Sequence, residues 1–219
     1  GLKKENVKYF YKKQSEILPT GTCLILVTPD SERTMCTFLG IAGKINENDV
    51  DEKIIKDSEL IFLEGYLWDE GEPKKAFEKA IDNAKKVAMS LSDLFCVKRH
   101  KQNFLELVEK KLDLTFANES EIMELINVKN FNEVIDFAKE INKHIVITRG
   151  EKGAISIFGN EIIEIEANKN LTIKDLTGAG DLFAAGYLHG FINNLSVRNC
   201  LELGTKLSSK VIQQIGARL

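Results

Sequence analysis

The sequence lacks the cysteine spacing that defines two common classes of small protein. Its 219 residues include four cysteines that lie far apart and form no C-x-x-C pair: Cys23, Cys36, Cys96 and Cys200. This spacing suits neither a disulfide framework nor a structural zinc site. We therefore expect a protein of a reducing compartment, and the cytoplasm is the location that fits best.

A long hydrophobic run is also missing. The longest uncharged apolar stretch spans residues 182–192, which is too short to cross a bilayer and is interrupted by Gly186 and His189. No signal-peptide pattern precedes Lys3 and Lys4 near the start of the chain. The sequence thus predicts no association with a membrane.

An excess of charge of one sign is absent as well. The 30 basic and 33 acidic residues leave a formal net charge of −3. Such a charge is too small to create a field that attracts nucleic acid or an anionic lipid surface. Nucleic acid is therefore not expected as a partner.

Two phosphate-binding motifs are missing. No G-x-x-x-x-G-K-[ST] sequence occurs, which excludes a P-loop. Gly178 and Gly180 form a G-x-G pair, but Phe183 stands where a dinucleotide-binding fingerprint requires glycine or alanine. A nicotinamide-dependent oxidoreductase is therefore disfavoured.

The chain does contain a regular alternation of short apolar runs and amphipathic segments, within an ordinary globular composition. That alternation predicts an α/β fold with a mainly parallel sheet covered by helices on both faces. The predicted strands are 23–27, 34–40, 59–65, 94–97, 112–117 and 144–149, followed by a hairpin of strands 154–158 and 161–166. The predicted helices are 73–91, 101–111, 119–127, 131–142, 179–193 and 197–214. The first two strands, joined by a turn at 29–32, would form part of a small β lid.

The segment from Asp175 to Asp181, with the sequence DLTGAGD, carries the most chemical information. Small residues at 178–180 allow the backbone to approach a ligand, and the free N–H groups at the start of the following helix attract an anion. Asp181 would reach a hydroxyl placed against a phosphate held there, which is the arrangement that phosphoryl transfer to an alcohol needs. The alternative is purely structural, because glycines make tight turns and aspartate complements the helix dipole.

Two further polar segments follow predicted strands, one from Asn118 to Glu121 and the other from Thr148 to Gly153. Because ligands of open α/β sheets bind at the carboxyl ends of strands, both can converge with the Asp175 segment. Asn118 could simply cap the next helix, whereas Glu121 could hold a hydrated Mg²⁺. The segment 148–153 could be a plain turn, or it could contact a nucleotide.

In this order and spacing, the three segments resemble the ribokinase-like (PfkB) family of carbohydrate and nucleoside kinases, and the resemblance runs from about Thr20 to the end of the chain. The segment 175–181 is similar to the family's D-T-x-G-A-G-D signature, with Leu176 in place of the usual threonine. The segments 118–121 and 148–153 match the family's N-x-x-E motif and its T-x-G-x-x-G nucleotide loop.

The resemblance implies an ATP- and Mg²⁺-dependent kinase that phosphorylates an alcohol group of a sugar or nucleoside. Asp181 would be the general base that takes the proton from the acceptor hydroxyl. Gly178, Ala179 and Gly180 would form the anion hole for the transferred phosphoryl group.

The resemblance also implies where the cofactors bind. Asn118 and Glu121 would position the magnesium-bound phosphates, with Glu121 as the metal-binding side chain. The residues that would line the ATP site are Thr148, Gly150 and Gly153, with Thr205 near the nucleoside. A monovalent cation such as K⁺ would lie beside the anion hole, held by Asp175, Thr177 and the backbone of Val211, Gln214 and Gly216.

The family's early segment, which carries its first strand and the residues that grip the acceptor, has no counterpart before Thr20. Residues 1–219 are therefore expected to be a single α/β kinase domain that lacks this segment, with 20–45 contributing partly to the lid. Such a fragment is expected to be inactive or poorly folded by itself. Within the lid, Arg33, Thr34 and Gly40 resemble positions that face the acceptor, and the exposed lid could pair with a twofold mate in a homodimer.

The acceptor is left open, because the contacts that distinguish sugars from nucleosides belong mostly to the missing segment. The segment 92–100 resembles a bacterial subgroup of sugar or adenosine kinases, and its Asp93, Arg99 and His100 are predicted to cap or pair structurally. A second hypothesis is a non-catalytic nucleotide-binding or regulatory protein on the same fold. ATP binding without turnover would favour that hypothesis.

Overall fold

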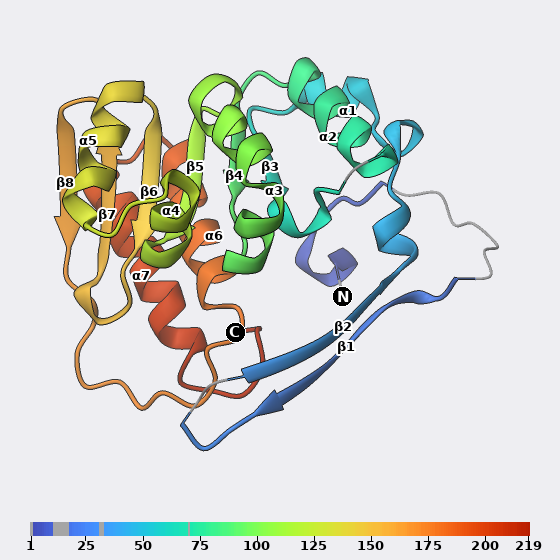
Figure 1. The fold of residues 1–219 in the computed structure, drawn as a ribbon. Helices are drawn as coiled ribbons and strands as arrows, with labels where there is room; N and C mark the ends of the chain where they lie inside the picture. The colour runs from blue at the N-terminus through green and yellow to red at the C-terminus, as the bar shows by residue number, and fades with distance from the viewer. Residues whose placement is uncertain (1, 11–17, 31–32, 70) are drawn as a thin grey trace.

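The computed structural model describes residues 2–10, 18–30, 33–69 and 71–219 (Figure 1). Six strands form one sheet in the order β3-β4-β5-β6-β7-β8. Their bounds are Ile61–Glu64 (β3), Val87–Ser90 (β4), Leu114–Asn118 (β5), His144–Thr148 (β6), Ala154–Phe158 (β7) and Glu161–Ile165 (β8). The strands β3 to β6 are parallel, and β7 and β8 extend the sheet as an antiparallel hairpin. The mainly parallel sheet is confirmed.

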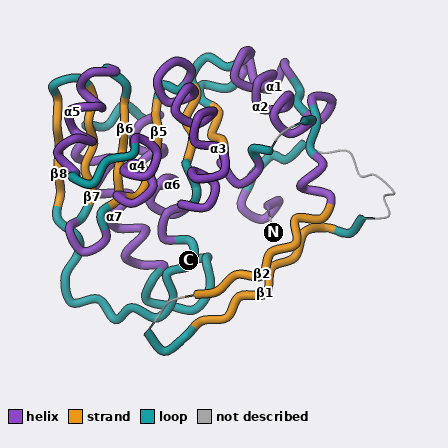
Figure 2. Tube along the Cα trace, viewed as in Figure 1, coloured by secondary structure: helices purple, strands orange, loops and turns teal. Residues whose placement is uncertain are grey.

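Helices cover both faces of this sheet (Figures 1 and 2). One hydrophobic core joins the sheet to α2 (Glu72–Asn83), α3 (Leu94–Glu106), α4 (Glu119–Ile126) and α5 (Phe131–Ile141), with the short α1 (Glu52–Asp57) beside α2. A second core lies under α6 (Ala179–Ile192) and α7 (Val197–Val211). Burial on both faces explains the continuous apolar sequence of β6, in which Ile145, Val146 and Ile147 are 0% exposed.

The prediction is wrong between residues 84 and 97. The predicted helix 73–91 ends at Asn83, and Val87–Ser90 form β4 instead. This apolar run fits a helical and an extended pattern equally well when it is seen alone. Pairing with β3 and β5 leaves Ala88 and Met89 0% exposed, and this burial overrides the helical pattern.

The predicted strand 94–97 is also wrong, because these residues form the first turn of α3. Asp93 is the N-cap of this helix, and its carboxylate accepts a hydrogen bond of 2.7 Å from the Phe95 N–H. The predicted capping role of Asp93 is thereby confirmed. A cap of this kind starts a helix where the apolar sequence alone suggests a strand.

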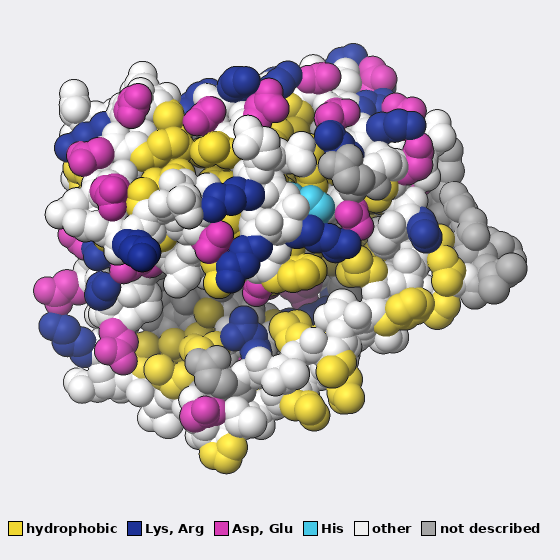
Figure 3. Space-filling view, viewed as in Figure 1, with side chains coloured by type: hydrophobic (Ala, Val, Ile, Leu, Met, Phe, Trp, Pro, Cys, Tyr) yellow, Lys and Arg dark blue, Asp and Glu magenta, His cyan; other side chains and the backbone are white. Residues whose placement is uncertain are grey.

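Strands β1 (Thr20–Val27) and β2 (Arg33–Gly40) form a separate antiparallel hairpin below the lower edge of the sheet in Figure 1. Nearly all of its side chains are exposed, and hydrophobic side chains line it in Figure 3. The prediction of an exposed pair of strands is confirmed. Of the predicted turn 29–32, Ser31 and Glu32 lie outside the described residues.

None of the helices in the described part of the chain is long and apolar enough to cross a bilayer.

Candidate active site

The start of α6 presents an open backbone surface at the carboxyl edge of the sheet. Gly178 is the N-cap at φ 80°, and a Cβ there would lie 2.8 Å from the Cβ of Ala217, so the position requires glycine. A Cβ at Gly180 would meet nothing within 4 Å. Among the residues that the structure describes, the N–H groups of Gly180 and Asp181 have no hydrogen-bond partner. These donors are free to receive an anion.

Asp181 stands in the first turn of α6 and is exposed. Its charge acts on Glu64, the last residue of β3. Burial raises the pKa of Glu64, the hydrogen bond from Ser92 opposes this, and the negative charge of Asp181 adds to the rise. The start of α6 and the end of β3 therefore lie within electrostatic reach of each other.

Asp175 connects the segment before α6 to the C-terminal turn. Its carboxylate accepts hydrogen bonds of 2.8 Å from the Thr177 N–H and of 2.9 Å from the Gly216 N–H, and the residue is 2% exposed. The Thr177 hydroxyl beside it and the Gly216 N–H hold the pKa of Asp175 below its usual range. The Thr177 Oγ1 atom is buried and reaches no partner with hydrogen-bond geometry in the described residues. The structure thus brings Asp175, Thr177 and Gly216 together.

Asn118 and Glu121 form a capping box at the start of α4. The Glu121 N–H donates to Asn118 Oδ1 at 2.8 Å, and the carboxylate of Glu121 accepts from the Asn118 N–H at 2.9 Å and from its side-chain amide at 2.6 Å. The capping alternative for Asn118 is confirmed, and the same bonds fix the direction of the Glu121 side chain.

Glu121 lies in a field of like charge at the carboxyl ends of the strands. Burial raises its pKa to about 7, the Asn118 N–H opposes this, and the charges of Asp93 and Glu64 raise it further. A divalent cation would stabilise the ionised carboxylate there. No group of three acidic, histidine or cysteine side chains in the described residues could hold a metal by itself. Mg²⁺ does not need one, since it commonly takes one or two carboxylates together with phosphate oxygens and water.

The loop from Thr148 to Gly153 follows β6 and closes on itself. The Arg149 N–H donates to the Gly153 carbonyl at 2.8 Å, and the Gly153 N–H donates to the Gly150 carbonyl at 3.0 Å. Gly153 has φ 92°, and a Cβ there would lie 2.0 Å from the Ile165 carbonyl oxygen. Gly150 also has a positive φ, of 56°, but faces open space. The loop thus needs glycine at 153 for packing, while the backbone at 150 is accessible.

A cavity of about 530 Å³ lies between β8, the chain after it and α7. Its lining includes the predicted Thr205, together with Glu164, Ile165, Glu166, Asn168, Arg198, Glu202 and Lys206. Figure 3 shows the surface hollowed in this region. Thr205 therefore lines a cavity between β8 and α7.

Three residues near the site are absent from the sequence prediction. Ser92 has φ 72°, which is uncommon for a non-glycine residue, and its hydroxyl bonds to Glu64 at 3.0 Å. The Tyr66 hydroxyl donates to the Ser92 carbonyl at 3.0 Å. Burial, followed by the charges of Asp93, Cys96, Glu121 and Asp181, raises the pKa of Tyr66. Glu64 could have been identified from the sequence, because it is a carboxylate at the very end of the apolar run 61–64.

The β1–β2 hairpin brings one predicted lid residue to the site. The positive charge of Arg33 lowers the pKa of Asp175, so the two side chains lie within electrostatic reach. Thr34 is the next residue of the strand and points to the opposite face of the hairpin. Gly40 is buried, with φ 56°, and a Cβ there would lie 2.3 Å from the Pro19 carbonyl oxygen. Arg33 and Thr34 therefore face different sides.

Comparison with known proteins identifies the class. The family model described as pfkB family carbohydrate kinase matches residues 1–219. The solved structure of adenosine kinase from Sinorhizobium meliloti is 34% identical, with a TM-score of 0.95, and the match covers 100% of this chain and 68% of that one. A probable sugar kinase from Rhizobium etli CFN 42 is also 34% identical, with a TM-score of 0.92 and coverage of 99% and 67%.

Curated relatives agree with the solved structures. Adenosine kinase of Dictyostelium discoideum is 29% identical over 219 residues, which cover 91% of this chain and 64% of the relative. Ribokinase of Lactococcus lactis is 29% identical, with coverage of 98% and 68%. The chain thus spans about two thirds of the length of these relatives. It belongs to the pfkB family of carbohydrate kinases, and its fold is the ribokinase-like α/β fold.

Proposed function

We propose that the protein is an ATP- and Mg²⁺-dependent phosphotransferase that phosphorylates an alcohol group of a small molecule. One observation carries this proposal: at the start of α6, the exposed Asp181 stands beside the open N–H groups of residues 180 and 181. Asp181 takes the proton of the acceptor hydroxyl as its oxygen bonds to phosphorus. The backbone of Gly178, Ala179 and Gly180 stabilises the charge on the transferred phosphoryl group.

The nucleotide site extends from α6 across the neighbouring strand ends. Thr148, Gly150 and Gly153 contact the phosphates and ribose through the loop after β6. The cavity with Thr205 receives the nucleoside part, and its volume suits a group of that size. Asn118 and Glu121 orient the phosphates, and a bound Mg²⁺ neutralises the phosphate charge. The capping box supports this role, because it holds the Glu121 carboxylate in one direction.

The exposed aromatic rings beside the site favour a nucleoside acceptor over a free sugar. Tyr66 is 51% exposed although its hydroxyl is anchored to the Ser92 carbonyl, and Phe95, three residues after Ser92, is 62% exposed. Exposed rings of this kind offer flat apolar surface to a nucleobase. The names of two relatives, adenosine kinase of Sinorhizobium meliloti and of Dictyostelium discoideum, agree with this choice.

Three further properties complete the proposal. Asp175 and Thr177 hold a monovalent cation such as K⁺, which the buried hydroxyl of Thr177 beside the buried carboxylate of Asp175 supports. The protein forms a homodimer through the β1–β2 hairpin. It resides in the cytoplasm, in agreement with its four free cysteines.

The proposal is tested by measuring ADP release from Mg-ATP with the complete gene product and a panel of nucleosides and sugars. We expect one nucleoside to drive turnover well above the rate without acceptor. A Tyr66→Ala variant should raise the KM for that nucleoside more than the KM for ATP. ATP binding without turnover on any acceptor would instead support a non-catalytic nucleotide-binding protein on the same fold.

A further inference from the structure

Arg149 joins the two ends of the proposed nucleotide site. It is the second residue of the loop 148–153, and its side chain is only 15% exposed. Its Nε donates to Glu119 at 2.8 Å, and its Nη1 donates to Glu164 at 2.6 Å. The guanidinium carbon lies 3.9 Å from the centre of the Phe131 ring. One planar group is thus fixed by two carboxylates and one aromatic face.

The two carboxylates belong to different parts of the site. Glu119 directly follows Asn118, so it lies in the first turn of α4 beside the capping box. Glu164 is on β8 and lines the cavity that contains Thr205. Phe131 is the first residue of α5. Arg149 therefore connects the loop after β6 to α4, α5 and β8.

The pKa of Glu119 indicates that its contact with Arg149 is electrostatically favourable. Burial alone would raise the pKa of Glu119, but hydrogen bonds from Arg149 and Lys152 outweigh burial and lower it. Both cations therefore stabilise the ionised form. Of these two cations, Arg149 also bonds to a second carboxylate, that of Glu164. In the described residues, the Lys152 Nζ bonds only to Glu119.

We propose that Arg149 is a positioning residue for ATP: it holds the phosphate end at α4 and the wall of the nucleoside cavity at β8 in a fixed relation. The inference rests on the proposed function of the site. Arg149 itself need not touch the nucleotide, because its donors are already engaged by Glu119 and Glu164. Without the guanidinium, the two ends keep their connection through strands β5 to β8 but lose the direct link, and ATP loses part of the benefit of binding both ends at once.

The test compares nucleotide binding by Arg149→Met and Arg149→Lys with binding by the unmodified protein. Met keeps the apolar stem, whereas Lys keeps the charge but lacks the planar fork that reaches two carboxylates. By calorimetry, we expect the Kd of Mg-ATP to rise about tenfold in both variants, because the two ends of the site are no longer held in the geometry that binds both parts of ATP. The Kd of Mg-tripolyphosphate should stay within about twofold, because this probe occupies only the phosphate end.

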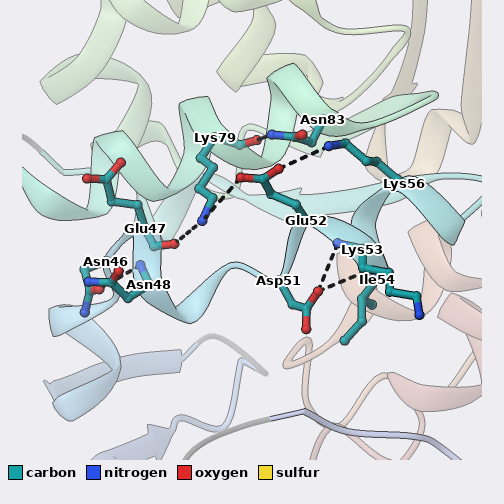
Figure 4. A network of polar contacts seen from close by, with 10 residues as sticks. All are labelled: Asn46, Glu47, Asn48, Asp51, Glu52, Lys53, Ile54, Lys56, Lys79 and Asn83. Atoms are coloured by element: carbon teal, nitrogen blue, oxygen red, sulfur yellow. Dashed lines mark hydrogen bonds and ion pairs between the residues drawn. The ribbon is translucent and has the colours of Figure 1, made fainter.

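A matched control is Lys79→Met in the network of Figure 4. Lys79, 26% exposed, donates to the Glu47 carbonyl at 2.7 Å and pairs with Glu52 at 3.8 Å, so it also joins separate helices. None of the predicted nucleotide-site residues belongs to this network (Figure 4). We expect Lys79→Met to leave the Kd of Mg-ATP unchanged even where it lowers Tm as much as the Arg149 variants do.

The outcomes separate the inference from the proposed function. If the unmodified protein does not bind Mg-ATP, the proposed function itself fails. If it binds Mg-ATP and the Arg149 variants bind as well as Lys79→Met does, the positioning role is refuted. Equal weakening of Mg-ATP and Mg-tripolyphosphate would also refute it, since Arg149 would then act on the phosphate end alone. Should Arg149→Met not fold, Arg149→Lys decides by the same comparison.

Discussion

At the start of α6, Gly178 and Gly180 are glycines for different physical reasons. Gly178 has a positive φ and lies against Ala217, so a side chain is excluded by the fold. Gly180 has neither restriction, and nothing within 4 Å would meet a Cβ. A glycine that the fold does not require, at the start of a helix with open N–H groups, indicates that a ligand approaches the backbone there.

This contrast predicts opposite effects of alanine at the two positions. Gly178→Ala should destabilise the protein by about 1–3 kcal/mol, because alanine would be strained and would contact Ala217. Gly180→Ala should leave the stability unchanged or raise it by up to about 1 kcal/mol, yet reduce turnover. Thermal unfolding and steady-state kinetics check both effects. Full turnover by Gly180→Ala would show that no ligand approaches this position.

His144 predicts how stability depends on pH. Burial lowers its pKa from 6.5 to about 4, and its Nε2 lies 2.8 Å from Ser156 Oγ and 2.9 Å from the Tyr187 hydroxyl. The unfolded chain binds a proton more readily than the folded protein between these two pH values. The stabilisation is therefore complete above pH 6.5 and is lost as the pH falls through about 4.

In His144→Phe this pH dependence should become weaker by roughly 2 kcal/mol across that range, because the titrating group is gone. Phenylalanine keeps the ring contacts, and the two hydroxyls can still bond to each other. Denaturant unfolding at about pH 4.5, 5.5 and 7 measures the free energy of unfolding of both proteins on either side of the pKa values above. If the free energy of unfolding of His144→Phe depends on pH as strongly as that of the unmodified protein, His144 does not take up a proton on unfolding.

At the scale of elements, the accuracy of the sequence prediction depends on where the stabilising contacts lie. The segments 118–121, 148–153 and 175–181 could be located because their turns and caps are encoded within a few adjacent residues. Strand β4 could not, because its extended form depends on pairing with β3 and β5. Since the end of β4 was misplaced, Ser92 and its bond to Glu64 could not be foreseen.

The β1–β2 hairpin yields a prediction at the same scale. Leu24 and Phe38 point to the same face of the hairpin and are 63% and 49% exposed. Burial of this face against a second copy would stabilise a dimer, since a two-stranded hairpin is marginal alone. In sedimentation experiments, the unmodified protein should therefore be a dimer. The double variant Leu24→Asp, Phe38→Asp should be a monomer.

Met35→Lys on the opposite face of the hairpin is the control, and it should leave the dimer intact. A monomer at all concentrations of the unmodified protein would contradict pairing through this hairpin.

For the whole molecule, the parallel order of β3 to β6 gathers residues that are far apart in the sequence at one edge of the sheet. Glu64, at the end of β3, is coupled electrostatically to Asp181 on α6 and to Glu121 on α4. Family resemblance located two of them. The contacts of Arg149 with Glu119 and Glu164 could not be predicted, because they depend on how α4 and β8 pack around the loop.

The central claim is that Asp181 is the base of a phosphoryl transfer at the start of α6. Asp181→Asn keeps the size of the side chain and removes its ability to accept the proton. With Mg-ATP and the acceptor found in the panel, we expect turnover to fall by about 10²–10⁴, while the Kd of Mg-ATP stays within about twofold. If Asp181→Asn retains the turnover of the unmodified protein, Asp181 is not the base and the account of this site is wrong.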